Sequence, residues 1–276
     1  STPIKSSAAS DVYKRQAFDQ GDFKSSISHM AEAKTLDPQK YGEQVNVLSV
    51  LSYHKLQDVN KLKEALETLQ KENPSAVARV PDVIPAWLGL QAYGMKDLET
   101  ADKYMTWATQ NDQLQNVKKV IWRNLAKVRL ALRKYDRALV ASNNFLKDED
   151  QPYRRADGML DKASILLGLG KYADARKTAE DALALGVEGP LMASLKIVLG
   201  DISYAEKKFD EAAKHYGVTA ELFVNDAELK PKALFKAAEA LDKAGRKSEA
   251  SQYRARLQKE FPDWKQDGES LPPDAR

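Results

Sequence analysis

Residues 199–216 read LGDISYAEKKFDEAAKHY, and this stretch decides the fold. Its small residue Ala212 follows the bulky Phe209 by three positions. The same combination of a mostly bulky residue and a small one recurs along the whole chain. The small residues are Ser26, Ala65, Ala101, Ala138, Ala175, Ala212 and Ala250, separated by 39, 36, 37, 37, 37 and 38 positions. So regular a step predicts seven copies of one structural unit.

Each copy is predicted to hold two helices joined by a tight turn. In the fifth copy, residues 163–169 carry apolar side chains at helical spacing, and Gly170-Lys171 interrupts them. Glycine is suited to the left-handed residue that ends a helix. The helical period resumes at Tyr172, and the alanines that follow would let two helices cross closely. No segment predicts a β-strand, so the predicted fold is all-α with about seven helical hairpins.

The composition excludes several classes of function. The 276 residues include 43 Lys+Arg and 40 Asp+Glu, and the net charge of +3 is too small to indicate nucleic-acid binding. The absence of cysteine excludes disulfides, a catalytic thiol and thiolate metal sites. With three histidines and no apolar run of 18 residues, we expect neither a metal site nor a transmembrane helix.

The repeat pattern resembles the tetratricopeptide repeat family, which carries Leu-Gly in the first helix and Ala-aromatic-Ala in the second. The residues of the sixth copy that fit are Leu199-Gly200, Phe209, Ala212 and Tyr216. The resemblance covers about Asp11 to Phe261, and the second copy departs most, with Asp58-Val59-Asn60 in place of a glycine turn. It implies stacked hairpins in a right-handed superhelix, whose first helices line a concave face. HEAT-type and pentatricopeptide solenoids are disfavoured, because the former lack this turn and the latter need a basic RNA-facing groove.

We expect a flexible segment over residues 1–10, a single solenoid domain over 11–264 and a tail over 265–276. The Ser/Ala-rich start resembles the spacer after a removed export signal, whereas residues 11–16 resemble a translated sequencing-adaptor end. The last copy, residues 233–262, resembles repeats of bacterial envelope-assembly proteins. A periplasmic or otherwise exported protein is therefore expected, with the cytoplasm as the alternative.

Few residues are candidates for chemistry, and the chain is predicted to be non-enzymatic, without a metal or cofactor. Residues 168–171, Gly-Leu-Gly-Lys, end a helix and lack the Ser/Thr of a phosphate loop. The run Asp148-Glu149-Asp150 lacks the alternating ligands of a calcium loop and is interpreted as a solvated loop. No histidine has a ligand partner at metal-binding spacing, although His54 falls on an expected inner helix.

The family's inner positions imply a concave recognition surface. The candidate partner-binding residues on it are Tyr93, Arg123, Lys127, Tyr204 and Phe235. Arg123 and Lys127 share one helix face and could meet an acidic group of the ligand. The expected function is a non-catalytic interaction scaffold for a peptide or protein partner. Three alternatives stay open: a non-catalytic portion of a larger enzyme or secretion machine, an enzyme with an active site in the groove, and binding through the convex face or the solenoid ends.

Overall fold

The computed structural model describes residues 16–110, 115–223 and 226–266, and every regular element in these ranges is helical. Residues 16–19 are helical and precede α2. The elements that follow are α2 (Phe23–Leu36), α3 (Pro38–Lys55), α4 (Val59–Glu72), η1 (Pro74–Arg79), α5 (Val83–Gly94), α6 (Leu98–Thr109), α7 (Gln115–Ala131), α8 (Tyr135–Lys147), α9 (Pro152–Gly168), α10 (Tyr172–Leu183), α11 (Gly189–Ala205), α12 (Phe209–Leu222), α13 (Leu229–Lys243) and α14 (Lys247–Glu260). The all-α prediction is confirmed.

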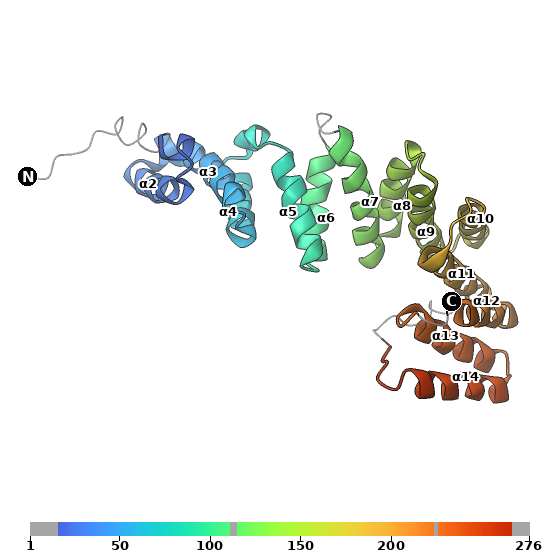
Figure 1. The fold of residues 1–276 in the computed structure, drawn as a ribbon. Helices are drawn as coiled ribbons and strands as arrows, with labels where there is room; N and C mark the ends of the chain where they lie inside the picture. The colour runs from blue at the N-terminus through green and yellow to red at the C-terminus, as the bar shows by residue number, and fades with distance from the viewer. Residues whose placement is uncertain (1–15, 111–114, 224–225, 267–276) are drawn as a thin grey trace, which may run out of the picture. The chain divides into compact units, whose positions relative to one another are not determined.

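The helices belong to two compact units that divide within α7, Ser1–Ile121 and Trp122–Arg276. Successive helices form hairpins, such as α5 with α6 in the first unit and α11 with α12 in the second (Figure 1). The single solenoid domain over residues 11–264 stays a prediction. The expectations for residues 1–10 and for most of the tail lie outside the described residues.

Each hairpin turn contains one residue with a left-handed backbone. These residues are Gly21, Gln57, Lys96, Arg133, Gly170, Lys207 and Gly245, with φ between 54° and 79°. The next residue donates its N–H to the carbonyl five positions earlier, as Asp58 does to Tyr53 at 3.1 Å. This bond satisfies a carbonyl that the end of a helix would leave free. The second hairpin therefore forms the same turn with Gln57 in place of glycine.

The small residues of the repeat lie where the two helices of a hairpin meet. In six of the seven hairpins the residue five positions after the turn residue is serine or alanine and is fully buried: Ser26, Ala101, Ala138, Ala175, Ala212 and Ala250. In the second hairpin that place is taken by Leu62, and Ala65 lies three positions further on. The predicted register of the second copy was wrong by three residues, because the turn is made by Gln57 and no glycine marks it.

The second helices begin differently in the two units. In the first unit Asp22, Asp58 and Asp97 cap α2, α4 and α6, and each side chain accepts a backbone N–H at 3.0–3.2 Å. In the second unit the equivalent residues are Lys134, Lys171, Lys208 and Arg246. A Lys or Arg side chain cannot accept a hydrogen bond, so these four helices lack a side-chain cap.

Close approach of the two helices explains the Leu-Gly motif of the sixth hairpin. A Cβ atom on Gly200 would lie 2.7 Å from Cδ1 of Tyr216 and 2.9 Å from its Cζ. Tyr216 is fully buried, and its hydroxyl donates to Oδ1 of Asp201 at 2.5 Å. The ring is therefore held against the backbone of α11, and only glycine leaves room for it.

Candidate functional site

The turn residues set the register of the first helices, and this register identifies the side chains on one face. Residues ten, six and three positions before a turn residue follow each other at spacings of four and three, so they lie on one side of the helix. On α7 they are Arg123, Lys127 and Leu130, and on α5 they are Ala86, Leu90 and Tyr93. On α3 they are Val47, Leu51 and His54. Val50 and Gln57 do not belong to this face, since Val50 is fully buried and Gln57 makes the turn.

In the first unit this face is apolar and aromatic. Leu90 and Tyr93 on α5 are half-buried, and Val83, two turns before Leu90, is 45% exposed. His54 on α3 contacts Trp87 on α5 edge-on, with ring centroids 5.4 Å apart. Burial, followed by the nearby charge of Lys55, lowers the pKa of His54, which favours the neutral imidazole at neutral pH. The face is therefore formed by partly accessible, uncharged side chains.

In the second unit the basic residues of the predicted surface already have acidic partners in the chain. Arg123 forms an ion pair with Asp157 of α9. Nζ of Lys127 lies 3.0 Å from Oδ1 and 2.8 Å from Oδ2 of Asp161. Burial raises the pKa of Asp161, while the Lys127 and Arg123 charges oppose that shift. Two ion pairs thus join α7 to α9, and the positive charge expected for an acidic ligand is largely compensated.

A related contact joins α11 to α13 with the charges exchanged. Nζ of Lys236 on α13 lies 2.7 Å from Oδ1 of Asp201 on α11. Lys127 and Asp201 both stand six residues before their turn residue, and Asp161 and Lys236 both stand nine before theirs. At these two positions the earlier helix α7 carries the base and α9 carries the acid. In the later pair the charges are exchanged, because α11 carries the acid and α13 carries the base. Between α9 and α11 these positions hold Ser164 and Val198.

The remaining two predicted binding residues are covered to different degrees by their own chain. Tyr204 is 4% exposed and packs edge-on against Phe209, with centroids 5.1 Å apart. Little of its ring is accessible to a partner, so its main role is in the core. Phe235 is half-buried, and Trp264 packs against it with a centroid distance of 5.6 Å. Tyr93 belongs to the first unit and the other four predicted residues to the second.

In the acidic run after α8, Asp148 and Asp150 are exposed as expected of a solvated loop, but Glu149 between them is not. Glu149 is 2% exposed, and its Oε1 accepts the backbone N–H of Gln151 at 3.1 Å. Nε of Arg154 lies 3.4 Å from Oε2 of the same side chain. Nη1 of Arg155 donates to the Glu149 carbonyl oxygen at 2.9 Å. This interpretation was wrong for Glu149 because the carboxylate anchors the start of α9 instead of facing water.

Neither a metal centre nor a membrane span emerges from the part of the chain that the structure describes. Its His, Asp and Glu side chains form no group of three placed to hold a metal ion. Its helices are too short or too polar to cross a bilayer. The contacts of this face that the sequence reasoning missed are those of the acids Asp157 and Asp161, and of Trp87 beside His54.

Comparisons with known proteins agree with this architecture. Residues 160–223, which cover most of the hairpins α9/α10 and α11/α12, match a family model described as Tetratricopeptide repeat. No curated protein matches the chain. Among solved structures, the apo form of RapI is 14% identical over 94% of this chain and 77% of its own, with a TM-score of 0.55.

Two further solved structures share the fold. A Rap protein complexed with Competence and Sporulation Factor is 15% identical over 95% of this chain and 78% of that one, with a TM-score of 0.56. The Cut9–Hcn1 hetero-tetramer of the APC/C is 16% identical over 94% of this chain and 47% of that one, with a TM-score of 0.52. At these identities the likeness concerns the fold alone. The family match over residues 160–223, the repeated hairpin turns and the shared fold together show a tetratricopeptide-repeat fold.

Proposed function

We propose that this chain is a non-catalytic scaffold that binds a protein or peptide partner through the exposed faces of its first helices. The observation that carries the proposal is the uncharged face of α3 and α5 in the first unit. Leu51, His54, Leu90 and Tyr93 are half-buried there, and Val83 is exposed. Half-buried apolar side chains still have surface to remove from water, which is the main driving force for docking.

The charges of the second unit are consistent with the same function. Arg123 and Lys127 carry their own counter-ions, Asp157 and Asp161. A partner that covers these pairs would bury nearly neutral groups and would not need to supply an acidic side chain. Partner binding is therefore expected to depend only weakly on salt, in contrast to binding by unpaired basic residues.

The fold is known to accommodate partners in other proteins. One Rap structure is a complex with Competence and Sporulation Factor, and Cut9 forms a hetero-tetramer with Hcn1. These structures support the proposal that this fold serves to bind a partner. Neither structure identifies the partner of this chain. A location in a bacterial cell envelope rests on the C-terminal repeat pattern alone. Protease accessibility in spheroplasts of the source cell would test that location.

Site-specific photo-crosslinking tests the proposed binding face. A benzoylphenylalanine side chain would replace Leu90 on α5 or Leu167 on α9, both on the inner positions of first helices. The control replaces Val140, which is 55% exposed on the second helix α8. We expect discrete adducts in the native cell from Leu90 or Leu167 and none from Val140. Adducts from Val140 alone would place the partner on the opposite side and contradict the proposal.

A further inference from the structure

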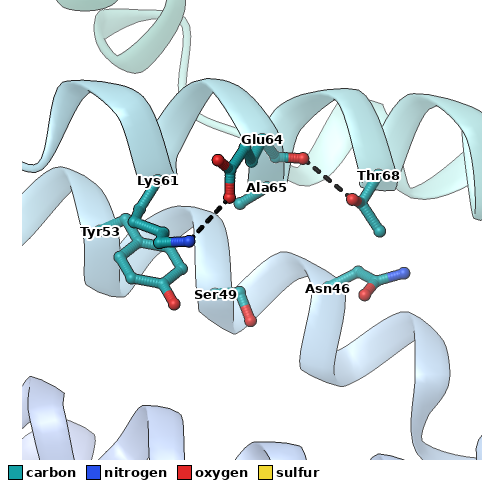
Figure 2. A pocket seen from close by; sticks show the side chains of 7 residues that line it. All are labelled: Asn46, Ser49, Tyr53, Lys61, Glu64, Ala65 and Thr68. Atoms are coloured by element: carbon teal, nitrogen blue, oxygen red, sulfur yellow. Dashed lines mark hydrogen bonds and ion pairs between the residues drawn. The ribbon is translucent and has the colours of Figure 1, made fainter.

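A polar crevice opens between α3 and α4 in the first unit, with a volume of about 200 Å³. Figure 2 shows Asn46, Ser49 and Tyr53 on α3 beside Lys61, Glu64 and Thr68 on α4, and we call these six residues the α3–α4 crevice. The three α3 residues are spaced by three and four positions, so they share one helix face. Leu51 and His54 lie on a different face, so the inference below does not depend on the proposed function.

In the second hairpin, polar side chains stand at two places of the first helix where several other hairpins have large apolar ones. Ser49 stands eight residues before the turn residue Gln57. At the same place α5, α7 and α11 carry the buried Leu88, Leu125 and Leu199, whereas α9 carries Lys162 and α13 carries Ala237. Asn46 takes the place that Trp122 has on α7. Shorter polar side chains leave the space between the helices unfilled and line it with hydrogen-bonding groups.

The two aliphatic hydroxyl groups of the crevice, on Ser49 and Thr68, are available as acceptors. Oγ of Ser49 donates its proton to the Val45 carbonyl at 2.8 Å. Oγ1 of Thr68 donates to the Glu64 carbonyl at 2.9 Å. Each hydroxyl has one proton, so the lone pairs are what either can offer to a ligand. The Glu64 carboxylate adds a further acceptor, because only Oε2 lies at hydrogen-bond distance from Lys61, at 2.9 Å.

Donors lie on the same crevice. Nζ of Lys61 has three N–H groups and uses one for Glu64, which leaves two for a ligand. The Tyr53 hydroxyl makes no hydrogen bond to another residue that the structure describes and can donate its proton. The Asn46 amide, in contrast, is engaged by Lys34 at 3.1 Å, Glu72 at 2.9 Å and Asn73 at 2.7 Å, so it forms a fixed wall.

We propose that the α3–α4 crevice binds the primary carboxamide of an Asn or Gln side chain in a peptide. A carboxamide offers one carbonyl acceptor and two N–H donors, which match Lys61 and Tyr53 on one side and the hydroxyls and Glu64 on the other. The Lys61–Glu64 pair has no net charge, so the crevice favours a neutral group over a carboxylate or an ammonium. Its volume of about 200 Å³ is several times the ~30 Å³ of one water molecule and accommodates such a side chain.

The test uses the ¹⁵N-labelled full chain and N-acetyl-L-glutamine N-methylamide as the probe. Two matched probes replace the glutamine by glutamate or by norvaline, which keep the main chain and change only the side-chain end group. Backbone amide shifts are followed by NMR during titration. We expect saturable shifts over residues 46–68 for the glutamine probe, with a Kd of about 1 mM for a ligand of this size. The other two probes should bind at least about threefold more weakly.

Three variants separate the crevice from general effects. Ser49→Leu fills the space and should weaken binding of the glutamine probe by about tenfold or more. Lys61→Met removes the donor from an exposed position, leaves the fold intact, and should weaken binding about threefold or more. Lys177→Met removes a comparable exposed partner of Asp181 on α10 and should leave the affinity unchanged.

Three results would overturn the proposal. The first is the absence of saturable shifts over residues 46–68 in the wild type. The second is an unchanged affinity for the glutamine probe in both variants, Lys61→Met and a Ser49→Leu variant that is folded. The third is equal affinity for the norvaline or glutamate probe.

Discussion

Replacing Gly200 and Gly42 by alanine is expected to change stability in opposite directions. Both glycines lie inside helices, α11 and α3, where alanine is the better helix former by roughly 0.5–1 kcal/mol. Around Gly42 no atom lies within 4 Å of the place of the new methyl group. Only the helix propensity then acts, and Gly42→Ala should raise the free energy of unfolding by about 0.5–1 kcal/mol.

At Gly200 the packing works against the substitution. The new methyl would lie 2.7 Å from Cδ1 of Tyr216, well inside the ~3.5 Å separation of two carbon atoms in contact. The Tyr216 ring cannot turn away without losing its 2.5 Å hydrogen bond to Asp201. Overpacking costs about 1–3 kcal/mol, and a lost hydrogen bond to a charged group about 1.5–3 kcal/mol. After the propensity gain of roughly 0.5–1 kcal/mol is subtracted from the sum of these costs, Gly200→Ala should lower the free energy of unfolding by about 1.5–5.5 kcal/mol.

Urea unfolding followed by circular dichroism measures both effects. The cycle also includes Tyr216→Leu and the double variant Gly200→Ala/Tyr216→Leu, in which the shorter side chain removes the clash. In the Tyr216→Leu background, Gly200→Ala should be neutral or stabilising. If Gly200→Ala in the wild-type background left the urea midpoint unchanged or raised it, the ring contact would not be the reason for the glycine.

Four further expectations concern single side chains. Lys171→Asp should raise the free energy of unfolding by about 0.5–2 kcal/mol over the control Lys171→Ala, because it supplies the cap that α10 lacks; equal urea midpoints would contradict this. Hydrogen bonds from Lys34 and Asn46 lower the pKa of Glu72 below 4.5. The ionised carboxylate therefore stabilises the folded state fully above that pH, and this stabilisation is lost as the pH falls through the lower pKa of the folded state. Glu72→Gln should therefore flatten the acid limb of a stability–pH profile and leave its shape above about pH 6 unchanged, whereas an unaltered acid limb would refute the linkage. Tyr204→Ala should cost about 3–5 kcal/mol as a core deletion. A wild-type melt for Tyr204→Ala would show that the Tyr204 ring is not part of the core. Tyr93→Ala, in contrast, should leave the thermal melt nearly unchanged and reduce partner crosslinking at Leu90.

Most of the fold was predictable because six of the seven hairpins meet the same steric requirement. A small side chain has to stand where two helices cross, and six of the seven small residues were identified correctly. The error at Ala65 arose because the alignment relied on a glycine turn. The aspartates that follow the turns carry the missing signal: aligning Asp58 with Asp97 pairs Leu62 with Ala101 and corrects the register.

The candidate site was predictable only as far as helical periodicity reaches. Register alone places Tyr93 on an accessible face, because a residue's side of a helix follows from its number. The partners of Arg123 and Lys127 require knowledge of the neighbouring helix. A signal was present, since Asp157 and Asp161 repeat the spacing of four at a distance of 34 residues. The burial of Tyr204 depends on Phe209, and no periodic pattern reports such a specific contact.

The exchanged charges between neighbouring first helices restrict how this array can be recombined. Hairpins of equal length are interchangeable in shape, so deletion of the two hairpins α9–α12 would preserve the helical step. In the present chain Lys127 pairs with Asp161, and Lys236 pairs with Asp201. The deletion would remove both acids and bring the ammonium groups of Lys127 and Lys236 opposite each other. Like charges at close range destabilise the junction. The order of the hairpins is thus encoded in side-chain charge, and shortened or permuted arrays would need a compensating substitution such as Lys236→Asp.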